Sequence, residues 1–485
     1  MTALMTGDSN RSRQQIPILP LRRAPRLTPP PPPPPPAAGV GCPPLDATET
    51  SAHSSGTGTA MEVAAYPDWS SLPDDLVATV MRALAIPDLL RAMAVCGSWR
   101  AAGSDVRRVR FPITDASPCL LYSCAADDAD TATLCSISAG AAFKLRLPPP
   151  ALRTRYVIGS GYGWVVAVNE FSNLQAFNPL TGAQVDLPPA TGLDFVESSS
   201  DDQGRLVYNL LYDFRDYREV YNPRELRLHL YYQVHLSCSP SAGSDCIVLL
   251  LHKHSGELSF ARIGDDRWTW ISTDFENVPL DSGYRTVAYN KNDGLFYVLS
   301  TSCFLCALDL NGPSPVAKLI IRRDADWDDP TRSYFVFAPW GDILLVARFM
   351  ELRRLTTPIQ VPPEHAEEVH NLFSESSTYE MLIFKLDVDA QKLVEISCSE
   401  LRDHALFLGF NSAVMLSTKD FPRVKPNCAY LTDDNWEQII GNMYSSREVG
   451  IWNFETQELE SLDDLQSIHP WLNWPPPIWI APSLS

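Results

Sequence analysis

A pair of histidines is the first feature of this sequence whose spacing would suit chemistry. His252 and His254 stand two positions apart, so on a β-strand both would face one side and could share a metal ion. A zinc site needs at least one further protein ligand, and the sequence offers none beside this pair. We therefore expect a structural or surface role for the pair and no metal site.

A cysteine pair and an aspartate cluster are the other candidates for metal binding. Cys303 and Cys306 form a CxxC in an apolar, strand-like run, but no second pair completes a zinc site, so core packing is expected. The aspartates within 324–329 crowd beside two arginines, without the glycine and terminal glutamate of an EF-hand loop. We expect a solvated loop there.

Motifs of known catalytic sites are absent from the sequence. It contains no GxSxG, no HExxH, no P-loop and no GxGxxG that precedes a helix. The Gly-rich stretch at 159–163 is not followed by a helical pattern, so a phosphate cradle is not expected. The sequence therefore predicts no catalytic residue, no cofactor and no metal, in a chain that acts by binding.

Charge and composition narrow the partners. The chain has 485 residues, 45% of them hydrophobic, and a formal net charge of -19, which argues against nucleic acid and anionic membranes. It has no apolar run of about 18 residues that would indicate a transmembrane helix. Its 11 cysteines, an odd count without a secretory signal peptide, fit free thiols in a reducing compartment. We expect the cytoplasm, the nucleus or both.

Most of the chain after residue 115 has the pattern of short β-strands between turns. Apolar runs alternate with clusters of Gly, Asn, Asp and Pro, and hairpins recur as four-strand units at intervals of about 45–80 residues. The expected units are 157–187, 247–271, 286–320, 334–396 and 405–462. The spans 118–147 and 204–236 could add one or two more.

Repetition of this kind is typical of a β-propeller, in which radial closure leaves few exposed strand edges. We expect a mainly β protein whose residues 115–485 form a propeller of four-stranded blades; an irregular pair of β-sandwiches is the alternative. The segment PEHAEEVHNLF at 363–373 is the strongest helical pattern in this region. It would be an insertion on one face of the propeller.

A helical pattern precedes the strands. The segment LPDDL at 72–76 would open a helix, with Ser71 as N-cap and Pro73 in the first turn, and Pro87 would start a second short helix. Apolar residues follow the helical period along both. Helices this short cannot bury that much apolar surface between themselves, which predicts a docking surface. The alternative is that the following domain covers it.

This stretch resembles the F-box, a three-helix motif that connects a substrate receptor to a cullin–RING ubiquitin ligase. The resemblance rests on the ordered pattern LPDDL…L…PDLL…VCxxW within 68–110. It implies a Skp-type adaptor as direct partner, and through it the cullin and RING subunits. The residues expected to contact the adaptor are Leu72, Pro73, Leu76, Val80, Leu84, Leu89, Leu90, Val95 and Trp99.

A second resemblance covers most of the strand region. The segments AFNPLTG at 176–182, YLTDD at 430–434 and WPPPIW at 474–479 are similar to segments of the KIB-type plant F-box proteins, which carry a C-terminal propeller. There they lie in an early blade, in a late blade and at the C-terminus, in the order found here. Membership implies a ligase receptor and leaves its target undefined.

The first 60 residues have the composition of a disordered tail. Eight consecutive prolines at 29–36 favour an extended polyproline II segment, and the rest is poor in apolar residues. A ligand for an SH3- or WW-like partner and an Arg-rich organelle transit peptide are alternative roles for this tail. Met61 stands just before the F-box pattern, so we expect residues 1–60 to be dispensable.

The function expected from these features is that of the substrate-recognition subunit of an SCF-type (Skp–cullin–F-box) E3 ubiquitin ligase, which performs no catalysis itself. A propeller enzyme acting on glycans and a non-ligase interaction scaffold are the alternatives. Two segments interrupt the hairpin rhythm, 321–333 and 349–378, and would contact the target protein through Trp327 and Phe373. The aspartates near Trp327 would select a basic target surface. Otherwise both segments are only tolerated insertions.

Overall fold

The structure is a computed structural model. It describes residues 69–483 except 85, 94, 110–116, 213–216, 253–255, 272–273, 276–277, 280–282, 303, 323–329, 356–373, 442 and 463–470. The expected tail at 1–60 and the expected helix at 363–373 lie outside the described residues. Among the described helices, none has the length and apolarity to cross a bilayer.

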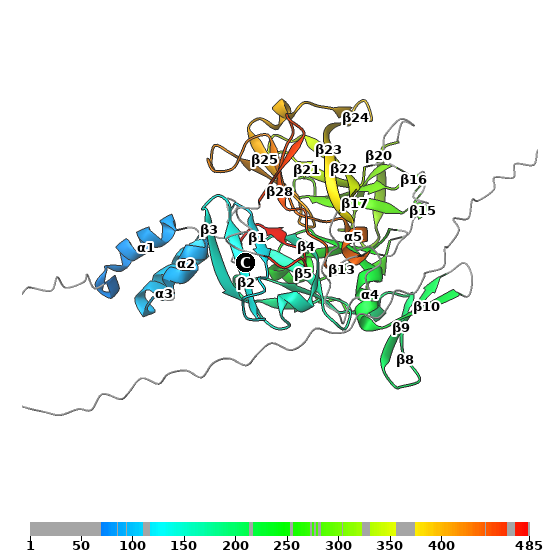
Figure 1. Ribbon diagram of the computed structural model, residues 1–485, viewed down its shortest axis with the longest axis horizontal. Coiled ribbons are helices and arrows are strands. Elements are labelled where there is room, and N and C mark those ends of the chain that lie inside the picture. Colours follow the sequence, from blue (N-terminus) through cyan, green and yellow to red (C-terminus); the bar gives the residue numbers. More distant parts are fainter. Residues whose placement is uncertain are drawn as a thin grey trace, which may run out of the picture. The chain divides into compact units, whose positions relative to one another are not determined.

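Three helices form the N-terminal part of the described chain (Figure 1). After a 3-10 turn, η1 (Trp69–Ser71), they are α1 (Asp74–Ala83), α2 (Ile86–Met93) and α3 (Gly97–Val109). Their shared core consists of Val77, Met81, Leu89, Ala92, Ala102 and Val106. The expected N-cap at Ser71 is wrong: Pro73 is the N-cap, and no side chain caps it by a hydrogen bond. The backbone carbonyl of Pro73 instead accepts the first helical bonds, from Leu76 and Val77.

Six sheets of four or five strands follow in the described residues, as expected for a propeller. Blade 1 is β1 (Cys119–Tyr122), β2 (Thr131–Ser136), β3 (Ala141–Arg146) and β30 (Ile478–Ile480). Blade 2 is β4 (Tyr156–Gly161), β5 (Trp164–Val168), β6 (Leu174–Phe177) and β7 (Gln184–Asp186). Blade 3 is β11 (Tyr231–Leu236), β12 (Ile247–His252), β13 (Glu257–Arg262) and β14 (Thr269–Trp270).

The later blades continue this order. Blade 4 is β17 (Tyr284–Asn290), β18 (Leu295–Ser300), β19 (Leu305–Asp309) and β20 (Val316–Ile321). Blade 5 is β21 (Arg332–Phe337), β22 (Ile343–Arg354), β23 (Ser374–Asp387) and β24 (Lys392–Glu395). Blade 6 is β25 (His404–Leu408), β26 (Val414–Ser417), β27 (Cys428–Leu431), β28 (Gly450–Asn453) and β29 (Glu458–Ser461).

Shorter elements connect the blades. Two small sheets, β8 (Val196–Ser200) to β9 (Leu206–Tyr212) to β10 (Tyr217–Tyr221), and β15 (Asp274–Phe275) with β16 (Val278–Pro279), belong to no blade. The helices are α4 (Pro223–Leu230) and α5 (Trp436–Gly441). The 3-10 turns are η2 (Leu152–Thr154), η3 (Ala190–Gly192), η4 (Pro240–Asp245) and η6 (Cys398–Leu401).

Blade 1 closes the ring by joining two distant parts of the chain. Its first three strands come from the start of the strand region, and β30 comes from the C-terminal end, with Leu120 opposite Trp479. This pairing covers a strand edge that would otherwise be free. The same pairing explains why the span 118–147 contains only three of the four strands of blade 1.

Two spans depart from the expected pattern. The span 204–236 does not make a blade: β9 and β10 pair with β8 in a separate sheet, and β11 belongs to blade 3. Blade 6 has five strands instead of four. Its strands β25 and β27 run parallel to each other, with Phe407 opposite Tyr430. A parallel pair requires a crossover connection, which hairpin turn signals cannot predict.

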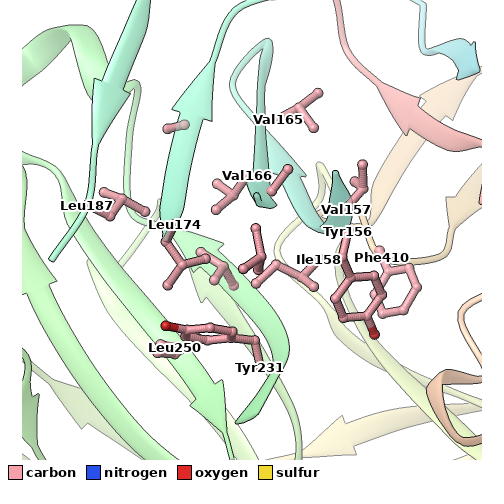
Figure 2. Close-up of a cluster of buried hydrophobic side chains, with 14 of the residues drawn as sticks. Tyr156, Val157, Ile158, Val165, Val166, Leu174, Leu187, Tyr231, Leu250 and Phe410 are labelled. Atoms are coloured by element: carbon pink, nitrogen blue, oxygen red, sulfur yellow. The ribbon is translucent and has the colours of Figure 1, made fainter. Parts of the chain in front are cut away.

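The core lies between successive blades and is apolar on both faces of each sheet. Every residue of β5 is buried, and so is every residue of β12, because a neighbouring blade covers each side. Figure 2 shows side chains of blades 2 and 3 packed together, among them Val166, Leu174 and Leu250. Gly159 allows β4 to approach β11 closely, since a Cβ there would lie 2.5 Å from the Val234 carbonyl oxygen.

The strand order assigns the connections of blades 2–5 to two opposite faces. Each of these blades is an antiparallel meander, and first strands of successive blades contact one another. The first-to-second connections, such as the one between β11 and β12, therefore lie on one face, which we call the hairpin face. The second-to-third and blade-to-blade connections lie on the other, the crossover face. The segments around 323–329 and 356–373 both start and end at the crossover face.

Candidate functional site

The surface of the helical domain carries exposed apolar side chains. On α1, Val77 and Met81 point into the core, whereas Leu76 and Val80, one turn apart, are 50% and 41% exposed. Val95, between α2 and α3, is 60% exposed. An exposed apolar strip of this kind is suited to binding a partner, because full burial of such a side chain is worth about 1.5–3 kcal/mol.

The other expected contact residues lie around this strip or beneath it. Pro73 is exposed, and Leu72, Leu84 and Trp99 are half-buried. The Trp99 indole Nε1 donates to the Trp69 carbonyl oxygen at 3.0 Å, which joins the end of the motif to its beginning. These positions leave part of each side chain accessible to a partner.

Leu89 requires a correction. It is completely buried in the core of the three helices, so it supports the surface and cannot itself lie on it. The physical reason is that α2 uses one apolar face to pack on α1 and α3. The side chain of Leu90 lies outside the described residues, so its role as a contact stays a prediction.

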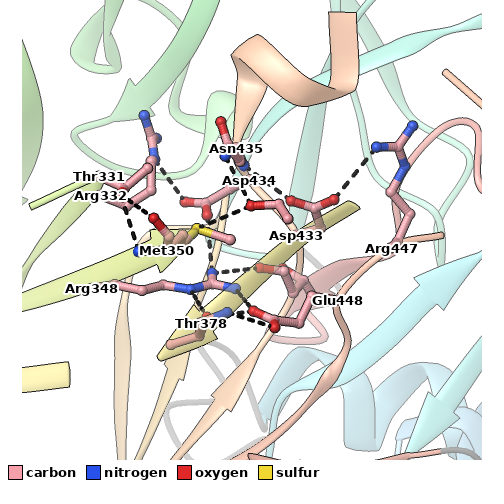
Figure 3. A network of polar contacts seen from close by, with 12 residues as sticks. Thr331, Arg332, Arg348, Met350, Thr378, Asp433, Asp434, Asn435, Arg447 and Glu448 are labelled. Atoms are coloured by element: carbon pink, nitrogen blue, oxygen red, sulfur yellow. Dashed lines mark hydrogen bonds and ion pairs between the residues drawn. The ribbon is translucent and has the colours of Figure 1, made fainter. Parts of the chain in front are cut away.

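Charged side chains that could do chemistry gather inside the propeller, between blades 5 and 6 (Figure 3). Arg348 of β22 is the centre. Its Nη1 lies 3.2 Å from Asp434 Oδ1, its Nη2 lies 2.6 Å from Glu448 Oε2, and its Nε donates to Thr378 Oγ1 at 2.8 Å. Arg348 is fully buried, and burial alone would lower its pKa, but Tyr334, Glu448 and Asp434 raise the pKa above its ordinary value.

Two further arginines complete this network. Arg332 Nε lies 3.3 Å from Asp434 Oδ2, and Arg447 Nη1 lies 3.4 Å from Asp433 Oδ2. The Tyr334 hydroxyl donates to Asp434 Oδ1 at 2.9 Å. Burial raises the pKa of Asp433 and lowers the pKa of Arg447, while each partner opposes the shift of the other. The attraction between the two groups therefore offsets part of the cost of burying them.

The network is structural in its geometry. Its three arginines and three acids, Arg332, Arg348, Arg447, Asp433, Asp434 and Glu448, are bonded to one another and shielded from solvent. It also binds the strand ends at the crossover face: Arg332 begins β21, and the Glu448 carboxylate accepts the backbone N–H of Thr378 at 2.8 Å. The end of segment 321–333 and both ends of segment 349–378 therefore lie at or next to residues that are bonded to blade 6.

Sequence reasoning found only one part of this network. The segment at 430–434 was noted as a family motif, and its aspartates are the acids that Arg332, Arg348 and Arg447 pair with. Arg348 and Asp434 stand 86 residues apart, and no local pattern links them. A buried-charge signal was available in one form, since Arg348 interrupts the apolar run at 343–350 within β22.

The remaining sequence candidates that the structure describes have the surroundings of core residues. His252 is buried, with Nε2 2.9 Å from Ser259 Oγ, and its ring stacks on Phe195. Burial raises the pKa of the Cys306 thiol to about 12, as suits a core residue. Among the described residues, no group of three His, Cys, Asp or Glu could hold a metal ion. His254, Cys303, Trp327, Phe373 and the aspartates of 324–329 lie outside the described residues.

Comparisons with known proteins agree with this architecture. Residues 134–453 match the KIB1-4 β-propeller family, and residues 69–110 match the F-box-like family. An F-box/kelch-repeat protein of Arabidopsis thaliana is 25% identical over 293 residues, 58% of this chain and 68% of its own length. A second Arabidopsis thaliana protein, also named as an F-box protein, is 22% identical over 382 residues, 76% of this chain and 84% of its own.

Solved structures add only a distant likeness. The β-propeller domain of Cps50 (Swd1) from Myceliophteria thermophila is 10% identical, with 58% of this chain and 86% of that chain covered and a TM-score of 0.25. A score that low carries no argument.

Proposed function

The chain belongs to the KIB1-4 β-propeller family, with an F-box-like segment before the propeller, and from this premise we propose that it is the substrate-recognition subunit of an SCF-type E3 ubiquitin ligase. The F-box would bind a Skp-type adaptor, which binds the cullin and its RING subunit. The propeller would hold the target protein. We place this activity in the cytoplasm, the nucleus or both, reducing compartments that suit nine described cysteines of which none forms a disulfide in this structure.

The observation that carries the proposal is the exposed apolar strip on α1. Leu76 and Val80 are large apolar side chains that face solvent while their neighbours Val77 and Met81 fill the core. Burial of this strip against an adaptor would supply binding free energy without any charged contact. Leu72 and Pro73 precede the strip and would extend the contact.

In this role the chain contributes geometry and no reacting group. The RING subunit brings a ubiquitin-loaded E2, and the propeller would hold target lysines near it. A reaction between two bound partners gains from the high effective concentration that binding provides. The charged cluster around Arg348 agrees with this role, because its arginine and carboxylate side chains form ion pairs with one another.

We propose that the target binds on the crossover face of the propeller. The segments containing Trp327 and Phe373 both emerge there, on either side of strands that the buried network fixes to blade 6. Loops held at rigid ends are common recognition elements. The acidic residues of 324–329 favour a basic surface on the target.

The test is co-purification of the full chain with a Skp-type adaptor, a cullin and a RING subunit, followed by a ubiquitin-transfer assay. Leu72→Ala combined with Pro73→Ala should weaken adaptor binding by about one to several orders of magnitude, at about 1.4 kcal/mol per decade. Unchanged adaptor affinity in this folded variant would contradict the F-box assignment. For the target face, replacing 324–329 or 356–373 with a Gly-Ser turn should lower the turnover of an identified target. Persistent turnover in both would place recognition elsewhere.

A further inference from the structure

Two cysteines meet across the connection between β11 and β12, on the hairpin face. Leu236 pairs with Val248, and the Ser237 N–H donates to the Ile247 carbonyl at 2.9 Å, so the next residues across are Cys238 and Cys246. Cys246 Sγ lies 3.2 Å from the Cys238 carbonyl oxygen. The pair thus extends the β11–β12 register by one position beyond Ser237.

The position within this register suits a disulfide. Because Ser237 and Ile247 are joined by a backbone hydrogen bond, Cys238 and Cys246 occupy the non-hydrogen-bonded position, where Cα atoms of opposite residues lie about 4.5 Å apart. Disulfides form at Cα separations of about 4.4–6.8 Å. The separation that is typical of this register position therefore falls within the range in which disulfides form.

The two thiols differ in the way that a reactive and a resolving cysteine differ. Cys238 is half-buried, whereas Cys246 is completely buried. A hydrogen bond from the Cys246 side chain lowers the pKa of Cys238 to about 7, and the same bond together with burial raises the pKa of Cys246. Cys238 is therefore the partly accessible thiol of the pair that ionises more readily, and thiolates are the species that oxidants attack.

We propose that Cys238 and Cys246 are an oxidation site at which hydrogen peroxide closes a reversible disulfide across the β11–β12 connection. The Cys238 thiolate attacks one peroxide oxygen, the O–O bond breaks, and the released hydroxide takes a proton to become water. The sulfur of Cys246 then attacks the sulfenic acid at Cys238. The S–S bond forms, and the hydroxyl group leaves with the Cys246 proton as a second water. A small dithiol reverses the reaction by exchange.

Another cysteine pair on neighbouring strands is a natural contrast. Cys135 lies on β2 opposite Leu120, one position from Cys119 of β1, and both thiols are buried. Burial raises the pKa of Cys119 to about 12 and that of Cys135 to about 11, so neither offers a thiolate near neutral pH. The two side chains lie on opposite faces of the sheet, in different clusters of the core, so both their geometry and their raised pKa values should leave these thiols reduced.

The consequence of oxidation is local. The disulfide would join the two ends of the connection that contains η4, beside the Tyr162 hydroxyl, which donates to the Ser237 carbonyl at 2.8 Å. A covalent tie removes conformations from the open connection. We expect slower amide hydrogen exchange over 239–245 in the oxidised protein.

The test uses the full chain treated with hydrogen peroxide, alkylation of the remaining thiols and tryptic mapping. Cys238 and Cys246 lie in one tryptic peptide, 228–253, which contains no other cysteine. The expected result is that this peptide loses two hydrogens, resists alkylation and regains both thiols with dithiothreitol, while the tryptic peptide 111–144, which holds both Cys119 and Cys135, stays alkylated.

Variants separate the two chemical steps. In Cys246→Ser, dimedone should trap a sulfenic acid on Cys238, and in Cys238→Ser no oxidation of the peptide should occur. Cys96→Ser is the matched control, because Cys96 is also half-buried, on the helical domain, and its loss should leave the disulfide unchanged. Full alkylation of both thiols after peroxide, or a disulfide from Cys238 to a different cysteine, would overturn the proposal. The unmodified chain answers this even where a variant fails to fold.

Discussion

The helical domain and the propeller distribute their side chains in opposite ways. The helical domain leaves Leu76 and Val80 in solvent, although their burial would stabilise it. The propeller buries even its charged residues, with Arg348 and Asp434 fully enclosed. The exposed apolar side chains would be covered by a binding partner, whereas the buried ions are already paired with one another within the chain. The contrast separates a region with apolar side chains on its surface, which we propose is used for docking, from one whose charged side chains are locked inside its core.

The largest expected effect comes from breaking the ion network of the propeller. Arg348→Met should reduce the free energy of unfolding by about 3–5 kcal/mol, because Asp434 and Glu448 would stay buried without their common partner. Chemical unfolding followed by tryptophan fluorescence measures it. Arg353→Met is the matched control: Arg353 lies on the same strand in an exposed pair with Glu351 and should change stability by less than about 0.5 kcal/mol. Equal effects would remove the distinction between core ions and surface ions.

The next effect tests whether the exposed strip binds without stabilising the fold. Leu76→Ala with Val80→Ala should weaken adaptor binding by about ten- to a hundredfold, since each side chain gives up about half of a full burial. The stability of the free chain should change by less than about 1 kcal/mol. Isothermal calorimetry and thermal unfolding give the two numbers.

Met81→Ala provides the opposite case on the same helix. Met81 is completely buried, so its loss should destabilise the helical domain by about 2–5 kcal/mol. Destabilisation by the Leu76 and Val80 substitutions on the scale of Met81→Ala would mean that the strip belongs to the core.

A smaller effect concerns a buried histidine of the propeller. His235 is fully buried, neither ring nitrogen has a hydrogen-bond partner among the described residues, and burial, with a minor contribution from Arg332, lowers its pKa from 6.5 to about 3. The unfolded chain binds a proton below pH 6.5 and the folded chain does not, so stability is lost as the pH falls from about 6.5 toward 3. This amounts to roughly 2 kcal/mol between pH 7 and pH 5.

The measurement for His235 is urea unfolding at a series of pH values. His235→Leu removes the titrating group and should remove this part of the pH dependence, while stability at pH 7 stays nearly the same. A pH dependence that is identical in the Leu variant would show that the imidazole is not held neutral. The buried polar groups of the propeller would then be less shielded from solvent than the comparison of the propeller with the helical domain assumes.

The smallest expected effect is that of the N-terminal extension. A protein that starts at Met61 should keep the melting temperature and adaptor affinity of the full chain, because a proline-rich polar segment has little apolar surface to bury. Differential scanning calorimetry and adaptor titration measure this. A loss of several degrees would show that residues 1–60 pack on one of the two regions.

The sequence alone was enough to determine the two kinds of region and their order. The pattern LPDDL at 72–76 with the later Trp99 indicated short amphipathic helices, since a helical period is a local property. Hairpin turns such as the one at 291–294 indicated five of the blades, blades 2–6, for the same reason. Family motifs then identified the propeller type, and residues 134–453 match that family.

Only the tertiary structure decided what depends on residues far apart in the chain. Closure of blade 1 pairs Leu120 with Trp479, and the parallel pairing of β25 with β27 follows a crossover; neither has a local signal. The acidic partners of Arg348 stand 86 and 100 residues away in the sequence. Leu89 lies in the core of the three helices, although its place in the apolar pattern of the helix was equally compatible with a contact surface. Local patterns specify which face of an element is apolar, whereas the neighbour that covers that face is chosen by packing across the whole fold.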